Sequence, residues 1–369
     1  MKIGLLLSKA ESLFTSGCVQ QTLFLKKTLI NCGFDVEFIS LAKDYTNFEM
    51  TNDPITFTDN SFDFSTFNIV ICTSLILSPE NNGEYITNLK SFKNVKFVCF
   101  VCGNIYLLNQ EEIVFSKHNI MFAYLSGVFD ETWILEMYSF SKDYMELLMK
   151  NPVRVLPHVW DNNIIDMYIE NNCPDMLEIT NKHNTSKVNL LIFEPNMSIH
   201  KTCLVPILIA EKYYIRYGHR VSNIFIFCSS GIKENLIKIF HNLEIFKDKK
   251  VEILGRVITP HAISCIRSIN PFLNIVVSHN IMNKLNFVHL EMFNSGIPIV
   301  HNCEPYKENG LYYEDGAEKY AIDLIEYARL SYDINEIRKN TNPIIDRYKP
   351  SNPNVIIKYT NACLDTVVP

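Results

Sequence analysis

Residues 277–302, VSHNIMNKLNFVHLEMFNSGIPIVHN, hold the side chains best suited to binding chemistry. The run predicts a strand end, a loop, a helix that carries Glu291, a turn at Gly296 and a second buried strand. A carboxylate on a helix beside a strand end can accept hydrogen bonds from both hydroxyls of a ribose, and a glycine lets the backbone approach a ligand closely. His279 and Asn283 lie between the strand and the helix and are candidates for contacts with a ligand. The alternative is that Glu291 only caps its helix.

A second candidate group lies in FEPNMSIHKT, residues 193–202, at the end of the apolar run VNLLIFE. Lys201 lies in the first turn of the next predicted helix, whose free N–H groups would face a phosphate, with Ser198 as the cap. Arg256, after a later strand, could supply a second positive charge or stack on a base. Ser230 belongs to the small-residue turn FIFCSSG. The alternative is an ordinary capped helix with a surface lysine.

Two turns in the first half of the chain carry further candidates. Gly17 precedes a predicted helix and could approach phosphates, although a simple turn would have the same sequence. Asn104 follows the apolar run KFVCFV and is a candidate for contacts with a sugar or an acceptor, or else part of a loop that satisfies its own backbone. The histidines have no paired spacing that suggests a metal site, so we expect His200, His279 and His301 to form hydrogen bonds or to be structural.

Short apolar runs alternate with longer amphipathic segments, which predicts parallel sheets covered by helices. The pattern restarts near residue 160, so we predict two doubly wound α/β sheets with a polar connector in 172–187. Ligands bind beyond the carboxyl ends of such strands where strand order reverses, and the cleft between the two sheets is the expected site. The main expected strands are 2–7, 35–40, 67–73, 96–101, 188–194, 222–228, 250–255, 273–278 and 297–302; the expected helices are 18–32, 131–149, 200–216, 232–242, 261–268, 287–295, 317–330 and 352–363.

Composition indicates a folded protein and narrows its partners. Of the 369 residues, 47% are hydrophobic and 20% charged, and a net charge of -6 offers no basic field, so we expect no nucleic acid partner. The 11 cysteines are scattered, and only Cys99 and Cys102 show C-x-x-C spacing, which favours buried strand cysteines over disulfides or zinc. The apolar start of the chain is too short for a signal peptide or a membrane span, so we expect a cytoplasmic protein, with peripheral membrane contact left open.

The absence of several sequence motifs disfavours the enzyme classes that use them. The chain lacks G-x-G-x-x-G after its first strand, a Walker loop and a G-x-S-x-G elbow, which disfavours dinucleotide dehydrogenases, P-loop NTPases and α/β-hydrolases. It also lacks an Asp-x-Asp pair, which disfavours sugar transferases that hold the donor diphosphate through a metal. We therefore expect neither a metal nor a cofactor.

Residues 277–302 resemble the donor-site segment of GT-B glycosyltransferases of the glycogen synthase-like, retaining class, also called family 4-like. The pattern of that class is an acid, a loop, a helix with a second acid, and then Ala-x-x-x-Gly-x-Pro-Val. Glu291 matches the second acid, and Gly296 and Pro298 match the Gly-x-Pro. Asn283 stands at the position of the first acid. In this class that acid contacts the donor sugar, so the resemblance does not carry this contact, or the retaining stereochemistry, over to this chain.

Two further segments extend the resemblance along the chain. VRVLPHVWD, residues 153–161, is similar to the passage that ends the N-terminal domain in this class. Lys201 matches a lysine that holds the donor diphosphate, whereas the usual arginine before it is replaced within the EPN stretch. Few glycines and many Asn, Ile and Lys residues suggest an AT-rich genome, as in large DNA viruses or some bacteria.

The resemblance implies a GT-B fold, with two Rossmann-like doubly wound domains facing a central cleft. Residues 1–165 would bind the acceptor, residues 186–350 the nucleotide sugar, and a C-terminal helix within 351–369 would cross back to the first domain. The implied activity is metal-independent transfer of a hexosyl or pentosyl group from a UDP- or GDP-type donor to a glycan or other acceptor. The implied catalytic residues are Asn104, His279 and Asn283, and the implied donor-binding residues are Gly17, Lys201, Ser230, Arg256, Glu291 and Gly296.

Two alternatives remain at this point. A nucleotide-sugar epimerase of the same fold would need acidic and histidine side chains that converge for proton abstraction. A degenerate scaffold that binds a glycan or a protein without catalysis is favoured by Asn283 in place of an acid.

Overall fold

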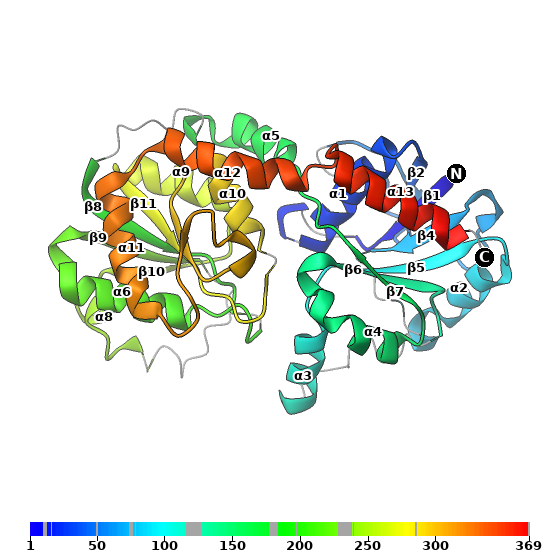
Figure 1. Ribbon diagram of the computed structural model, residues 1–369, viewed down its shortest axis with the longest axis horizontal. Helices are drawn as coiled ribbons and strands as arrows, with labels where there is room; N and C mark the ends of the chain where they lie inside the picture. Colours follow the sequence, from blue (N-terminus) through cyan, green and yellow to red (C-terminus); the bar gives the residue numbers. More distant parts are fainter. Residues whose placement is uncertain are drawn as a thin grey trace. The chain divides into compact units, whose positions relative to one another are not determined.

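The computed structural model describes residues 1–9, 13–15, 17–48, 51–73, 77, 79–115, 127–176, 184–196, 198–227, 238, 240–284 and 286–367. The chain forms two compact units (Figure 1): residues 1–161 with 347–369, and residues 162–346. The predicted domains ended at 165 and began again at 186, whereas residues 162–185 are grouped with the second unit.

The first unit contains a seven-stranded sheet, ordered β3-β2-β1-β4-β5-β6-β7, in which every neighbouring pair is parallel. The inner strands are apolar and almost fully buried, as expected when helices cover both faces. The strands are β1 (Lys2–Leu7), β2 (Asp35–Ser40), β3 (Ile55–Phe57), β4 (Ile69–Cys72), β5 (Lys96–Val101), β6 (Glu131–Leu135) and β7 (Val153–Leu156), and the helices are α1 (Gly17–Asn31), α2 (Pro79–Ser91), α3 (Ile105–Phe115), α4 (Lys142–Met149) and α13 (Pro353–Val367).

The second unit contains a six-stranded parallel sheet, ordered β10-β9-β8-β11-β12-β13. Crossovers between parallel strands are right-handed, so the helices α6 and α10, whose crossovers run in opposite directions from the central strands β8 and β11, are expected on opposite faces of the sheet. In the structure α11 packs on α6, and α9 packs on α10 (Figure 1). The strands are β8 (Asn184–Ile192), β9 (Val221–Phe227), β10 (Val251–Leu254), β11 (Phe272–Val277), β12 (Ile299–His301) and β13 (Leu311–Tyr312), and the helices are α5 (Asn163–Asn172), α6 (Leu204–Tyr217), α8 (Glu244–Lys247), α9 (Thr259–Ile269), α10 (Phe287–Ser295), α11 (Glu318–Ser331) and α12 (Ile334–Tyr348).

The C-terminal helix α13 packs on α1 and β7 and is part of the first unit. Buried Tyr359 donates a hydrogen bond from its hydroxyl to the Pro157 carbonyl over 2.9 Å. Near the end of the helix, Asp365 pairs with Arg154 over 2.9 Å. The segment 153–157 therefore packs against the last helix of the chain.

One predicted helix is wrong in its first part. We expected a helix over 131–149, but Glu131–Leu135 is the buried strand β6, paired with β5 and β7. Its residues Trp133, Ile134 and Leu135 are buried on both faces of the sheet, so they show no polar alternation. A short apolar run of this kind looks the same in a strand and in a helix when only the sequence is considered.

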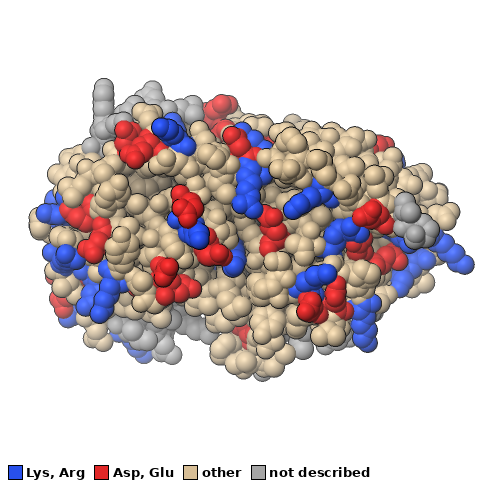
Figure 2. Space-filling view, viewed as in Figure 1, with Lys and Arg blue, Asp and Glu red and all other residues tan. Residues whose placement is uncertain are grey.

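The surface is mixed in charge. Acidic and basic side chains are interspersed over the face shown in Figure 2, without a broad field of either sign. Within the described ranges, no helix is long and apolar enough to cross a membrane.

Candidate functional site

Polar residues of the second unit gather where its strand order reverses. From β8 the chain continues to β9 on one side, and β11 pairs with β8 on the other, so the loops after β8 and β11 diverge. Glu194 follows β8, Ser278 follows β11 and Asn302 follows β12. We call these three residues, with Asn280 and Asn283 of the loop before α10, the carboxyl-edge cluster.

Hydrogen bonds join the whole carboxyl-edge cluster. Ser278 Oγ donates to Glu194 Oε1 over 2.7 Å, and Asn280 Nδ2 donates to Ser278 Oγ over 3.0 Å. Asn302 Oδ1 accepts from the Asn280 backbone N–H over 2.8 Å, and Asn283 Nδ2 donates to Asn280 Oδ1 over 3.3 Å. All five side chains are buried, so the cluster is a fixed polar structure at the end of an apolar sheet.

Three buried polar atoms on elements of this edge have no hydrogen-bond partner in the described part of the chain: Glu194 Oε2, Asn196 Nδ2 and His289 Nε2. Buried polar atoms nearly always bond to protein, ligand or water, and leaving one unpaired costs about 1–3 kcal/mol. The carboxyl, amide and imidazole groups offer both donors and acceptors. A ligand rich in oxygen could satisfy them.

Burial sets the charges around the cluster. Burial raises the pKa of Glu194 to about 7, although the Ser278 hydrogen bond and the nearby charge of Lys201 lower it. Burial lowers the pKa of His279, and it lowers that of His289 further. Both imidazoles are therefore uncharged near neutral pH, and Lys201 is the cation whose charge acts on Glu194.

Lys201 is held in a tight turn after β8. Asn196 has a left-handed backbone with φ of 56°; its N–H donates to the Lys201 carbonyl over 3.0 Å, and its Oδ1 accepts from the Cys203 N–H over 2.8 Å. The expected helix start near 200 with Ser198 as its cap is wrong, because α6 begins only after Cys203. Ser198 Oγ instead lies 2.9 Å from His200 Nδ1.

Glu291 is buried in the middle of α10. Its carboxyl bonds to Thr259 at the start of α9, and burial raises its pKa to about 7. The cap of α10 is Asn286, whose Oδ1 accepts from the Val288 N–H over 3.2 Å, so Glu291 is not a helix cap. Gly296 ends the helix at φ of 71°, and a Cβ there would lie 2.5 Å from a side-chain carbon of α12, which gives this glycine a conformational and packing role.

The other predicted site residues have separate positions. Arg256 is exposed in the loop between β10 and α9. In the first unit, Gly17 is exposed at the start of α1, and Asn104 is buried after β5, where its Oδ1 accepts from the Leu107 N–H over 3.1 Å. Ser230 lies outside the described residues.

Sequence reasoning found part of this edge. Of the predicted residues, Lys201, His279 and Asn283 lie on its loops. The residues it missed share a visible signal, a polar side chain at or just after the end of an apolar strand: Glu194, Ser278, Asn280 and Asn302. Among the described residues, no three His, Cys, Asp or Glu side chains are placed to hold a metal ion.

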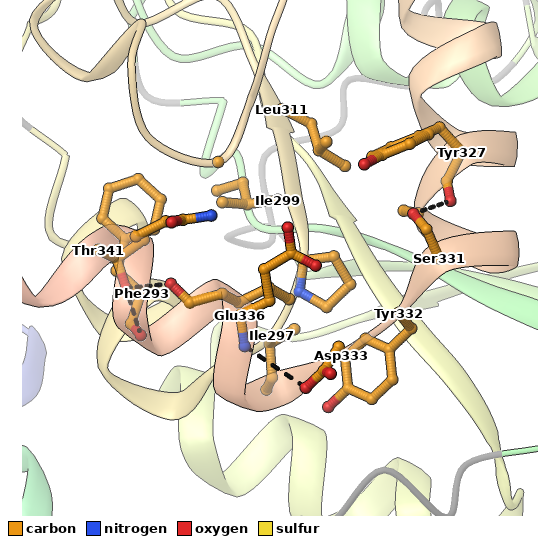
Figure 3. A pocket seen from close by; sticks show the side chains of 15 residues that line it. Phe293, Ile297, Ile299, Leu311, Tyr327, Ser331, Tyr332, Asp333, Glu336 and Thr341 are labelled. Atoms are coloured by element: carbon orange, nitrogen blue, oxygen red, sulfur yellow. Dashed lines mark hydrogen bonds between the residues drawn. The ribbon is translucent and has the colours of Figure 1, made fainter.

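A cavity of about 170 Å³ lies elsewhere in the second unit, at the amino ends of β12 and β13 (Figure 3). Its walls are largely apolar, and Glu336 of α12 extends its carboxylate among the lining side chains (Figure 3). The cavity shares no residue with the carboxyl-edge cluster, so we assign it no part in this site. Its lining includes Phe293, Ile297, Pro298, Ile299, Leu311, Tyr327, Ala328 and Ile337.

Solved structures share this architecture along almost their whole length. A glycosyltransferase from Rickettsia africae aligns with a TM-score of 0.59 and 14% identity, covering 100% of this chain and 98% of its own. Sucrose-phosphate synthase from Thermosynechococcus elongatus aligns with a TM-score of 0.59 and 11% identity over 99% and 98% of the two chains. The Anabaena protein HepE, in complex with UDP, aligns with a TM-score of 0.60 and 12% identity over 98% and 100%.

These alignments establish the fold. Both units of the chain are α/β with parallel, doubly wound sheets, and together they form a GT-B fold, as the sequence predicted. No curated protein matches the sequence. Residues 3–363 match the family described as "Protein of unknown function (DUF2827)", and the chain belongs to this family.

Proposed function

We propose that the protein is a glycosyltransferase that moves a sugar from a nucleotide-sugar donor to a glycan or other acceptor. The observation that carries this proposal is the set of buried atoms on Glu194, Asn196 and His289 that have no hydrogen-bond partner among the described residues; they lie at the strand-order reversal, and Lys201 is close enough for its charge to act on Glu194. Nucleotides bind at such reversals in open α/β sheets. The fold supports the same class of reaction, because the structural neighbours named above include a glycosyltransferase.

The donor is proposed to lie over the carboxyl edge of the second sheet. Lys201 and the Asn196 amide would hold the diphosphate and stabilise the charge that develops on it as the leaving group departs. Glu291 is assigned to the ribose, and His279 and Asn283 to the sugar. A UDP-type donor is favoured, since HepE was solved with UDP and also with UDP and glucose, and a GDP-type donor is the second choice.

Catalysis without a metal is also part of this proposal. Lys201 and backbone or amide N–H groups can supply positive potential at a diphosphate without a divalent ion, and the remaining rate enhancement would come from positioning. The glycogen synthase-like class is retained as the proposed relationship, on the match of Glu291, Gly296 and Pro298 to its pattern.

Thermal unfolding with UDP-, GDP-, ADP- and dTDP-linked sugars, each with and without magnesium, tests the donor site. A nucleotide present at 100 times its dissociation constant should stabilise the protein by about 2.7 kcal/mol. The shift should be lost in Lys201→Ala and kept in Lys339→Ala, which removes an exposed lysine of α12. Release of the nucleoside diphosphate from the stabilising donor would then show turnover.

Other results would point elsewhere. If no nucleotide sugar shifts the unfolding of the wild type, the transferase proposal fails and a degenerate scaffold becomes the better account. If the donor is converted to an isomeric nucleotide sugar, the protein is an epimerase. A shift that requires magnesium would contradict the metal-independent mechanism.

A further inference from the structure

Glu194 is an unusual neighbour for a diphosphate. It is 1% exposed, its Oε1 accepts from Ser278 over 2.7 Å, and its Oε2 is buried without a hydrogen-bond partner in the described residues. Asn196 Nδ2, two residues along the same loop, is likewise buried and without a partner. Two polar atoms from one short loop therefore point to a shared ligand at this edge.

Among the described residues, Lys201 is the cation whose charge acts on the Glu194 carboxyl. Lys201 comes from the same loop as Glu194. His279 follows β11, and its backbone N–H interacts with the Glu194 carboxyl. Tyr313 follows β13 and donates a hydrogen bond from its hydroxyl to the Ser278 carbonyl over 3.2 Å. His279 and Tyr313 are neutral near pH 7, because burial lowers the pKa of the first and raises that of the second. His289, on α10, is neutral for the same reason as His279.

An ionised Glu194 would oppose the anion that the site is proposed to hold. Its negative charge would offset Lys201 and face the diphosphate across a short, water-poor distance, where like charges repel strongly. Protonation reverses this effect, because a carboxylic acid is neutral and its O–H is a donor. Hydrogen bonds from an O–H group to an anionic oxygen are among the strong ones in proteins.

We propose that Glu194 binds the donor diphosphate as a neutral carboxylic acid and donates a hydrogen bond from Oε2 to a phosphate oxygen, so that binding takes up one proton from solvent. The step is a proton transfer: an O–H bond forms on the carboxylate, the bond of that proton to water or buffer breaks, and no other covalent bond changes. The inference rests on the proposed function, since it concerns the same donor site. It makes Glu194 a specificity-determining residue that favours a ligand rich in acceptors.

Proton uptake can be measured directly. Calorimetric titration of the full chain with UDP and with GDP at pH 8, in HEPES and in Tris, gives the number of protons bound, because the measured heat depends on the ionisation heat of the buffer. We expect about one proton for the wild type and for Glu308→Gln, an exposed control, and none for Glu194→Gln. Between pH 7 and pH 9, the wild-type affinity should fall about 50-fold, while that of Glu194→Gln should change less than about threefold.

The outcomes separate this inference from the proposed function. Binding of UDP or GDP by the wild type without proton uptake would overturn the inference and leave the donor site in place. Equal proton uptake by Glu194→Gln would overturn it as well, because another group would then be the acceptor. No binding of either nucleotide between pH 6 and pH 9 would overturn both. If Glu194→Gln does not fold, Ser278→Ala replaces it: loss of the hydrogen bond that lowers the Glu194 pKa should move the fall in affinity to higher pH, and an unchanged pH dependence would overturn the inference.

Discussion

Replacing Glu291 with glutamine should make the protein more stable at alkaline pH. The folded-state pKa of Glu291 is about 7 because the carboxyl is buried, against an ordinary value of 4.5. The folded protein therefore holds this proton more tightly than the unfolded chain does. The stability that it contributes is complete below about pH 4.5 and is lost as the pH rises toward 7. At 1.36 kcal/mol for each unit of pH between these two values, the loss amounts to about 3 kcal/mol.

Glutamine keeps the shape of the side chain but cannot ionise, so the variant avoids this loss. We expect the wild type and Glu291→Gln to be similar in free energy of unfolding at pH 4, and the variant to be more stable by about 1 kcal/mol at pH 5 and by about 3 kcal/mol at pH 8. Urea unfolding at pH 4, 5, 6, 7 and 8 measures the difference, with Glu308→Gln as the exposed control. The buried histidines titrate in both proteins, so subtraction removes their effect.

A constant difference between pH 5 and pH 8 would refute this reasoning. It would mean that the Glu291 carboxylate is as well stabilised in the folded protein as in water, and that Thr259 or another partner compensates for its burial. A variant that became less stable than the wild type as the pH rose would refute it more strongly, because the sign of the linkage would be reversed.

Three further substitutions test the packing. Gly296→Ala should lower the free energy of unfolding in urea by about 2–4 kcal/mol, because its φ is 71° and a Cβ would collide with α12. The control Gly316→Ala, at φ of 82° with open space around the Cβ, should lower it by only about 1 kcal/mol. Equal losses in the two variants would contradict the steric argument. Tyr359→Phe should cost about 1–2 kcal/mol by removing the hydroxyl that bonds to the buried Pro157 carbonyl, and an unchanged midpoint would show that this bond adds nothing. Ala328→Leu should add about 1–2 kcal/mol by filling the apolar cavity of the second unit, and a loss of stability would mean that the cavity is too narrow.

The predicted elements match best where the sequence pattern is strongest. The strands 2–7 and 35–40 and the helix 287–295 have the predicted bounds, because turn residues at both ends of an apolar run mark where the element begins and ends. The edge strands β3 and β13 were missed, since three and two residues carry no periodic signal. The helix expected at 232–242 falls largely outside the described residues.

The candidate site was harder to predict than the fold. Its central hydrogen bond joins Glu194 and Ser278, which are 84 residues apart, and the sequence does not show which loops become neighbours after strand pairing. Lys201 was predicted from its match to the lysine that holds the donor diphosphate in the GT-B class. Glu194 was noted only as part of the EPN stretch that replaces the usual arginine, and its burial, which raises its pKa, is seen only in the structure.

Two buried carboxyls that weaken the folded state lie in the part of the molecule where the function is proposed. Glu194 and Glu291 both have pKa values near 7 from burial, so each weakens the folded state when it ionises near neutral pH. Nonpolar residues of similar volume would avoid this loss, and the neighbouring strands β8 and β11 use such residues at most of their buried positions, apart from the hydrogen-bonded pair Asn189 and Asn274. Natural proteins retain locally unfavourable groups chiefly at functional sites. A ligand that pairs with Glu194 Oε2 and Asn196 Nδ2 would turn two unfavourable buried atoms into binding contacts, which accounts for their position at the strand-order reversal.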